Sequence, residues 1–109
     1  AMQDILKKSN EYIPTPDNIL DYISKYYGIE KEIICGQQRV KDAVAARQIA
    51  MYLMRNLTNL PLKEIGEEFG GRNHATVLSS IRKVEELLKS DPEIAATVRD
   101  ITSNINSKN

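Results

Sequence analysis

The run FGGRNHATVL, from Phe69 to Leu78, places versatile polar side chains directly after a pair of glycines. Arg72 can form two parallel hydrogen bonds to a phosphate or a guanine, and Asn73 can pair with base edges. His74, the only histidine, can contact a base or a phosphate, although a capping or simply exposed histidine fits equally well. Paired glycines end helices and asparagine begins them. The pattern therefore predicts a helix that stops, turns and restarts near Asn73.

The elements around this run all follow a helical pattern. Apolar residues recur at spacings of three and four, and no stretch of strict alternation persists, so we expect an all-α protein. The predicted helices cover residues 16–27, 30–35, 42–58 and 62–69, followed by one that begins near residue 73 and one that begins at residue 91. Gly66 lies inside the fourth of these, where glycine costs about 1 kcal/mol relative to alanine. We expect it to allow the close approach of another helix.

A short helix, a glycine turn and a longer helix with an apolar inner face are typical of a helix-turn-helix. The second helix of this motif usually offers its first residues to the DNA major groove. Here those residues are 72–76. On the outer face of the same helix, small residues (Ala75, Ser79) precede basic ones (Arg82, Lys83), which suits entry into a groove followed by contact with the backbone.

The charge of the chain is concentrated in its centre. The net charge of the 109 residues is zero, which argues against a general polyanion binder. Residues 36–83, however, carry eight basic and four acidic side chains, a net charge of +4, whereas the segments 1–35 and 84–109 each have a net charge of −2. Such a patch can steer an anionic partner.

The long helix predicted over residues 42–58 has one buried and one basic face. Ala46, Ile49 and Leu53 share the apolar stripe, and Gln48 and Arg55 lie nearly opposite, with Arg47 to one side. Taken alone, a charged face of this kind is an ordinary solvated surface. Its place within the electropositive segment makes a phosphate-binding face the alternative.

The chain resembles the C-terminal DNA-binding domain of the bacterial chromosomal replication initiator DnaA. The resemblance rests on IGEEFGGRNHATVL, on PTPDNILDYISKYYGI before it and on RQIAMYLMRNLTNLPLKEIG between them, and it covers about residues 14–105. It implies a six-helix, Trp-repressor-like domain that occupies residues 14–107. This domain would recognise the DnaA box at the replication origin, with a helix-turn-helix in the major groove and a basic loop in the minor groove.

The resemblance also implies a set of DNA-contacting positions: Arg39, Lys41, Arg47, Gln48, Arg55, Leu62, Lys63, Arg72, Asn73, His74, Ala75 and Thr76. Arg39 would enter the minor groove with Lys41 beside it. The three positions on the long helix would meet the DNA backbone, Leu62 and Lys63 would meet a phosphate, and the last five would read the major groove.

Some positions depart from the family pattern. The family usually has aspartate at the position of Asn73 and threonine or serine at that of Ala75. Asparagine can donate as well as accept and can suit adenine, so the base preference at this position is open. Gln37, Gln38 and Asp42 occupy loop positions where related sequences often carry lysine or arginine. Fewer phosphate partners predict a shallower dependence of affinity on salt.

The sequence does not predict an enzyme. It has no GxxxxGK[ST] phosphate loop and no serine-histidine-acid pattern, and its single histidine and single cysteine, Cys35, make no metal set. We expect no cofactor in this chain. The resemblance implies an ATP site in a preceding domain, to which residues 1–13 would connect, with an Ala1-Met2 start that looks like a vector remnant.

Other expectations concern compartment and partners. The lone cysteine favours a reducing compartment, and no apolar run could cross a bilayer, so we expect a cytoplasmic protein. The resemblance further implies that it is bacterial and nucleoid-associated. The expected partner is double-stranded DNA, bound by a monomeric domain. The alternatives are a related domain of a paralogue or a mobile-element protein, and a helical protein-interaction module that has lost DNA binding.

Overall fold

The computed structural model describes residues 14–106 of the chain, and within them it is all-α. The helices are α1 (Pro16–Tyr27), α2 (Lys31–Ile34), α3 (Lys41–Leu57), α4 (Leu62–Glu68), α5 (His74–Ser90) and α6 (Pro92–Asn106). The expected fold class is thus confirmed, and each expected helix boundary lies within about one residue of the observed one. The linker expected over residues 1–13 and the domain end expected at residue 107 lie outside the described residues.

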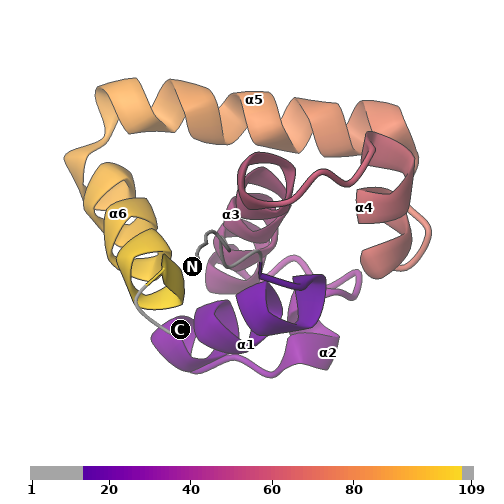
Figure 1. Cartoon of the computed structure of the whole chain (residues 1–109), viewed down its shortest axis with the longest axis horizontal. Coiled ribbons are helices and arrows are strands. Elements are labelled where there is room, and N and C mark those ends of the chain that lie inside the picture. Colours follow the sequence, from indigo (N-terminus) through magenta and orange to yellow (C-terminus); the bar gives the residue numbers. More distant parts are fainter. Residues whose placement is uncertain (1–13, 107–109) are drawn as a thin grey trace, which may run out of the picture.

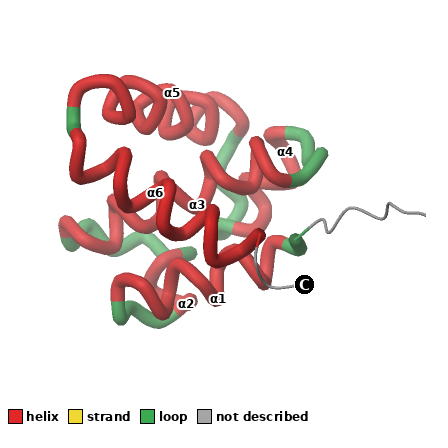
Figure 2. The backbone as a smooth tube through the Cα atoms, turned by 60° about the vertical axis from the view of Figure 1, so that its left-hand side comes forward, coloured by secondary structure: helices red, strands yellow, loops and turns green. Residues whose placement is uncertain are grey.

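Helix α3 forms the centre of the fold. It packs against α1, α2, α4 and α5, while α6 packs against α1 and α5. In Figure 1, α5 runs along the top, α1 and α2 lie at the bottom, and α3 lies between them. Figure 2 shows the same arrangement from a second direction. Side chains spaced by three and four on α3, such as Ile49, Ala50 and Leu53, are almost fully buried, as the apolar stripe of its sequence predicts.

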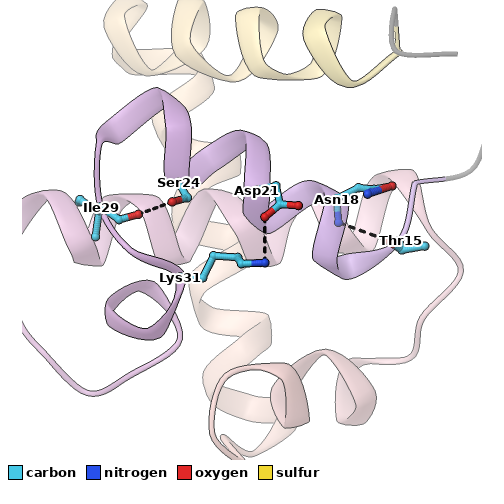
Figure 3. A network of polar contacts seen from close by, with 6 residues as sticks. All are labelled: Thr15, Asn18, Asp21, Ser24, Ile29 and Lys31. Atoms are coloured by element: carbon cyan, nitrogen blue, oxygen red, sulfur yellow. Dashed lines mark hydrogen bonds and ion pairs between the residues drawn. The ribbon is translucent and has the colours of Figure 1, made fainter.

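The lower layer of Figure 1 is held by capping and one ion pair. The hydroxyl of Thr15 accepts a hydrogen bond from the Asn18 N–H at 3.1 Å and so caps the start of α1. The Ser24 hydroxyl donates to the Ile29 carbonyl at 2.6 Å, beyond the end of that helix. Lys31 of α2 pairs with Asp21 of α1 at 2.8 Å (Figure 3). Each contact is local or nearly so, which is why sequence signals place α1 and α2 well.

The turn between α4 and α5 depends on glycine at three positions. Gly70 and Gly71 have φ values of 79° and 82°, in the left-handed region that L side chains rarely adopt. Gly66 is needed for space, because a Cβ atom there would lie 2.0 Å from the Arg72 carbonyl oxygen. We expected a neighbouring helix to approach Gly66. The nearest atoms instead belong to the turn backbone, and the Val77 side chain of α5 comes next at 3.4 Å.

None of the helices in residues 14–106 has both the length and the apolar character that crossing a membrane would require.

Candidate nucleic-acid interface

The first turn of α5 is exposed and carries free backbone donors. Asn73 is its N-cap, and the Asn73 side-chain oxygen accepts a hydrogen bond from the Thr76 N–H at 2.9 Å. The backbone N–H groups of His74 and Ala75 have no hydrogen-bond partner within residues 14–106. Residues 73–76 are all exposed. This turn can therefore offer both side chains and N–H groups to an anion, which the dipole of the 17-residue helix also favours.

Arg72 does not extend outward with these residues, as the expectation of a base-reading arginine would require. Its guanidinium donates from Nη1 to the Phe69 carbonyl at 2.7 Å and from Nη2 to the Gly36 carbonyl at 2.9 Å. Nη2 is also 3.3 Å from the Gln37 side-chain oxygen. Phe69 is the C-cap of α4, and helix ends leave carbonyls without helical partners. The Phe69 carbonyl therefore lacks a helical donor, and Arg72 supplies one, which explains why its side chain lies against the protein.

Arg47 also differs from the expected exposed, phosphate-binding side chain. Only 7% of its surface is exposed. Its Nε donates to the Ile34 carbonyl at 2.7 Å, and its Nη2 donates to the carbonyls of Ile33 at 3.2 Å and Gln38 at 2.9 Å. Two of these carbonyls belong to the end of α2, and the third lies in the loop before α3. Arg47 thus stabilises the segment that leads to Arg39.

Arg55 shows a weaker version of the same behaviour. Its Nη1 donates to the Leu60 carbonyl at 3.0 Å, in the connection between α3 and α4. Unlike Arg47, Arg55 is exposed, so it retains donors toward solvent. Its position remains compatible with the expected contact to a DNA backbone.

Unlike Arg72, Arg47 and Arg55, Arg39 donates to no backbone carbonyl of the described residues. Its side chain is exposed and has no hydrogen-bond or ion-pair partner in the described part of the chain. The loop that carries it is held at two residues that precede Arg39, by Arg47 at Gln38 and by Arg72 at Gly36. An unpaired cation on a constrained loop is available to a ligand without first breaking an internal contact.

Two hollows that share one residue bring half of the expected residues together. The first, of about 410 Å³, is lined by Gln37, Arg39, Val44, Arg47 and Arg72. The second, of about 360 Å³, is lined by Lys63, Glu67, Gly71, Arg72, Asn73 and His74. Arg72 belongs to both, so the hollow beside the loop before α3 and the hollow at the start of α5 meet at this residue, and their lining is net positive despite the acid Glu67.

A further hollow lies along α5. It is lined by Ala75, Leu78, Ser79, Arg82, Lys83 and Glu86. These include the small and basic residues expected on the outer face of the helix. The remaining expected positions line none of these hollows: Lys41, Gln48, Arg55, Leu62 and Thr76. Leu62 is partly buried against the core, and Lys41 is exposed at the first turn of α3.

Two ionisable groups near the loop have shifted pKa values. Burial lowers the pKa of the Arg47 guanidinium, and the nearby positive charge of Arg72 lowers it further. Burial raises the pKa of the Cys35 thiol, and the charge of Glu68 adds to the increase. Arginine remains protonated at any physiological pH, so Arg47 and Arg72 together keep the loop positively charged.

Gln37 was not among the expected DNA-contacting residues. Its side chain accepts from Arg72 across 35 positions of sequence, and no local pattern signals a contact of that range. One weak signal was present: Val40, the N-cap of α3, cannot cap through its side chain, so the preceding loop needs support from elsewhere. Among the described residues, no cluster of three or more histidine, cysteine or acidic side chains could hold a metal ion.

Comparison with known proteins agrees with this geometry. Residues 16–84 match the family model described as bacterial DnaA protein helix-turn-helix. The chain is 43% identical over 95 residues to the chromosomal replication initiator protein DnaA of Neisseria meningitidis serogroup C and to that of Neisseria gonorrhoeae. The matched part is 87% of this chain but 18% of each relative, so the chain spans about a fifth of their length. On both measures, the chain belongs to the bacterial DnaA helix-turn-helix family.

Proposed function

We propose that this domain binds duplex DNA at sites of the DnaA-box type and thereby supports initiation of chromosome replication. Family membership supports a role in DNA binding during replication initiation. The observation that carries the proposal further is the shared position of Arg72, which joins the hollow beside Arg39 to the hollow at the start of α5. A duplex presents its two grooves side by side, and a net positive surface with two separate projections suits that shape.

In this proposal the start of α5 enters the major groove. His74, Ala75 and Thr76 are exposed there, and the free N–H groups at the helix start can take a phosphate. Ala75 has no polar atom in its side chain and can contact a thymine methyl group. Arg82 and Lys83, further along the exposed face, would meet the backbone.

The loop before α3 supplies the second projection. Arg39 is exposed and unpaired in the described residues, and it would enter the adjacent minor groove. Lys41 and Lys63 are exposed and would meet phosphates. We assign Arg47 a supporting role for the loop, because its surface is almost fully covered by protein.

The same proposal covers the wider setting of the domain. A domain of this kind acts as a monomeric DNA-binding unit in the bacterial cytoplasm, while any ATP-dependent chemistry belongs to another part of the initiator. Arg39, Lys41 and Lys63 are exposed, so their donors are accessible to the phosphates of a DNA backbone.

Binding to two labelled duplexes tests the proposal. One carries a DnaA box and the other carries the same bases in scrambled order, and both are titrated with this chain over a series of salt concentrations. We expect binding to the box to be tighter by about 10³-fold or more at physiological salt. Equal affinities at every salt concentration would rule out sequence-specific recognition.

Arg39→Ala provides a second arm of this experiment. The variant removes an unpaired, exposed side chain and should weaken binding to the box about 10-fold while leaving the fold intact. Unchanged affinity would remove the loop from the interface and favour a site limited to α5.

A further inference from the structure

Arg72 connects the turn before α5 with the loop that carries Arg39. No other described side chain donates hydrogen bonds to both of these segments. Its Nη1 holds the Phe69 carbonyl at the end of α4, and its Nη2 holds the Gly36 carbonyl and the Gln37 side-chain oxygen. These groups lie 3 and up to 36 positions away in sequence. One guanidinium thus joins the turn before α5 to the loop that carries Arg39.

We propose that Arg72 is a positioning residue that, with Gln37 as its partner, sets where Arg39 lies relative to the start of α5. The proposal rests on the proposed DNA-binding function and deepens it. Arg72 acts through Arg39 and is not itself a base reader. The two grooves are then read by one preorganised unit, with the spacing between the two projections set before DNA arrives.

The chemistry of the side chain supports this assignment. A guanidinium has a planar fork of donors and can hold three acceptors at once, whereas a lysine ammonium on a flexible stem cannot reproduce that geometry. Arg72 is also half-buried between its partners, in contrast to the exposed residues 73–76 that follow it. Swinging outward to a base would leave the Phe69 and Gly36 carbonyls without these donors, at a cost that a solvent-facing arginine does not have.

The loop before Arg39 is held by a second arginine, Arg47, in addition to Arg72. Arg47 holds Gln38 from within the core while Arg72 holds Gly36 and Gln37, so the two arginines grip consecutive residues just before Arg39. Arg39 itself has no hydrogen bond or ion pair in the described residues. Its placement is therefore determined by the backbone of the three residues before it. Loosening either grip enlarges the space that Arg39 samples and raises the entropy lost on binding.

A double-variant cycle tests the proposal with the box duplex as probe. The proteins are the parent, Arg39→Ala, Arg72→Lys and the protein with both changes. If Arg72 acts through Arg39, the combined loss of affinity falls short of the product of the separate losses by about threefold or more, as for residues in one network. If Arg72 reads DNA independently, the losses multiply and the proposal is overturned.

A control cycle and a substitute variant accompany this test. Arg82→Lys, on the exposed face of α5, replaces Arg72→Lys in a control cycle, and its loss should multiply with that of Arg39→Ala. Gln37→Ala changes an exposed side chain and leaves the fold intact, so it covers the case in which Arg72→Lys unfolds. In a cycle with Arg39→Ala, the combined loss of affinity should again fall short of the product of the separate losses, by a smaller factor than for Arg72→Lys. A fully multiplicative Gln37→Ala cycle also counts against the proposal.

A measurement without DNA separates this proposal from the proposed function. Backbone order parameters of residues 37–40 in the free protein should fall from about 0.85 toward 0.6 in Arg72→Lys, while those of α3 and α5 stay unchanged. Unchanged loop order parameters overturn the positioning role even if DNA binds well. If the protein fails to discriminate the box from the scrambled duplex, the proposed function fails, and the order parameters still decide whether Arg72 positions the loop.

Discussion

The side-chain oxygen of Asn73 accepts a hydrogen bond from the backbone N–H of Thr76 at 2.9 Å, and this contact uses one of the two lone pairs of that oxygen. Its amide N–H group remains as the free donor. The cap thus takes up part of the accepting capacity of Asn73 and none of its donating capacity, and a free amide donor suits acceptors such as adenine N7 or guanine O6. Under the proposed function, helix capping and base preference are therefore coupled in this one side chain.

The Asn73→Asp variant tests this coupling. The carboxylate keeps the cap and adds a negative charge at the start of α5, whose first turn holds no acid, so the free energy of unfolding should rise by about 0.3 to 1 kcal/mol. The base preference at one position should change toward a donor such as cytosine N4, because the amide donor is lost. Thermal unfolding and binding to duplexes with all four base pairs at each position measure both effects.

The control for that variant is Asn73→Ala, which removes the cap. It should lower the free energy of unfolding by about 1 kcal/mol and leave no preference for a particular base at that position. An identical base preference in the parent and in Asn73→Asp would contradict the coupling.

Arg47→Ala should destabilise the fold. The variant removes the Arg47 donors from the carbonyls of Ile33, Ile34 and Gln38, of which the Ile34 contact is buried, and we expect a loss of about 2 to 3 kcal/mol in the free energy of unfolding. Chemical denaturation measures it. Lys41→Ala, which removes an exposed cation nearby on the same helix, should stay within about 0.5 kcal/mol of the parent. Equal stability of the two variants would mean that the buried contacts of Arg47 contribute nothing.

Gly66→Ala should be more harmful than a helix-propensity argument allows. Alanine at an ordinary helix position gains up to about 1 kcal/mol over glycine. Here its Cβ would lie 2.0 Å from the Arg72 carbonyl oxygen, so we expect a net loss of about 1 to 3 kcal/mol and a displaced start of α5.

Gly71→Ala is the matched variant for this prediction. It meets no atom within 4 Å and pays only for its φ of 82°, about 1 to 2 kcal/mol. Denaturation combined with affinity for the box separates the cases, since only Gly66→Ala forces atoms of the turn to move. A stabilised Gly66→Ala protein would show that the turn backbone yields easily.

Lys63→Ala should reduce the dependence of DNA affinity on salt. Each phosphate contact contributes about 0.9 to the slope of log affinity against log salt concentration, so removing the exposed Lys63 should lower the slope by that amount. Lys89→Ala removes an equal charge from the last turn of α5, far along the helix from its first turn, and should leave the slope unchanged. Equal slopes for the two variants would place Lys63 outside the interface.

Cys35 should make the fold sensitive to alkali. The pKa of its thiol is raised above the usual value of 9.0 by burial, so the folded protein binds the proton more tightly than the unfolded chain does. Stability is then fully present below about pH 9 and is lost as the pH rises through the folded pKa. Unfolding curves from pH 7 to 11, compared with those of Cys35→Ala, should show a shallower decline in the variant. Tyr27, whose pKa burial also raises, contributes a decline common to both proteins.

Helix positions and the turn could be predicted from the sequence because their signals are local. Thr15 caps α1, Asn73 caps α5, and the pair Gly70-Gly71 ends α4 through positive φ values, all within four residues of the helix that they bound. The exposed residues 74–76 follow from the same reasoning, since an apolar inner face at Val77 and Ile81 leaves the opposite face to solvent.

The roles of the arginines could not be predicted in the same way. A helical wheel assigns Arg47 a side of α3, but its carbonyl partners lie 9 to 14 positions earlier in the chain. Arg72 reaches 36 positions back to Gly36. Whether a basic residue faces DNA or caps a helix depends on which backbone carbonyls the tertiary fold leaves unsatisfied, and a linear pattern does not contain that information.

The carbonyl of Gly66 receives the N–H groups of Phe69 at 3.0 Å and of Gly71 and Arg72 at 3.1 Å. Three donors that converge on one oxygen fix how many residues separate α4 from α5, because one inserted or deleted residue would break this convergence. Residues 73–76 are exposed and donate no hydrogen bond to this oxygen, so the convergence does not restrict which side chains they carry. Under the proposed function, substitutions in residues 73–76 would alter the bases that are recognised, whereas the number of residues between α4 and α5 has to stay the same.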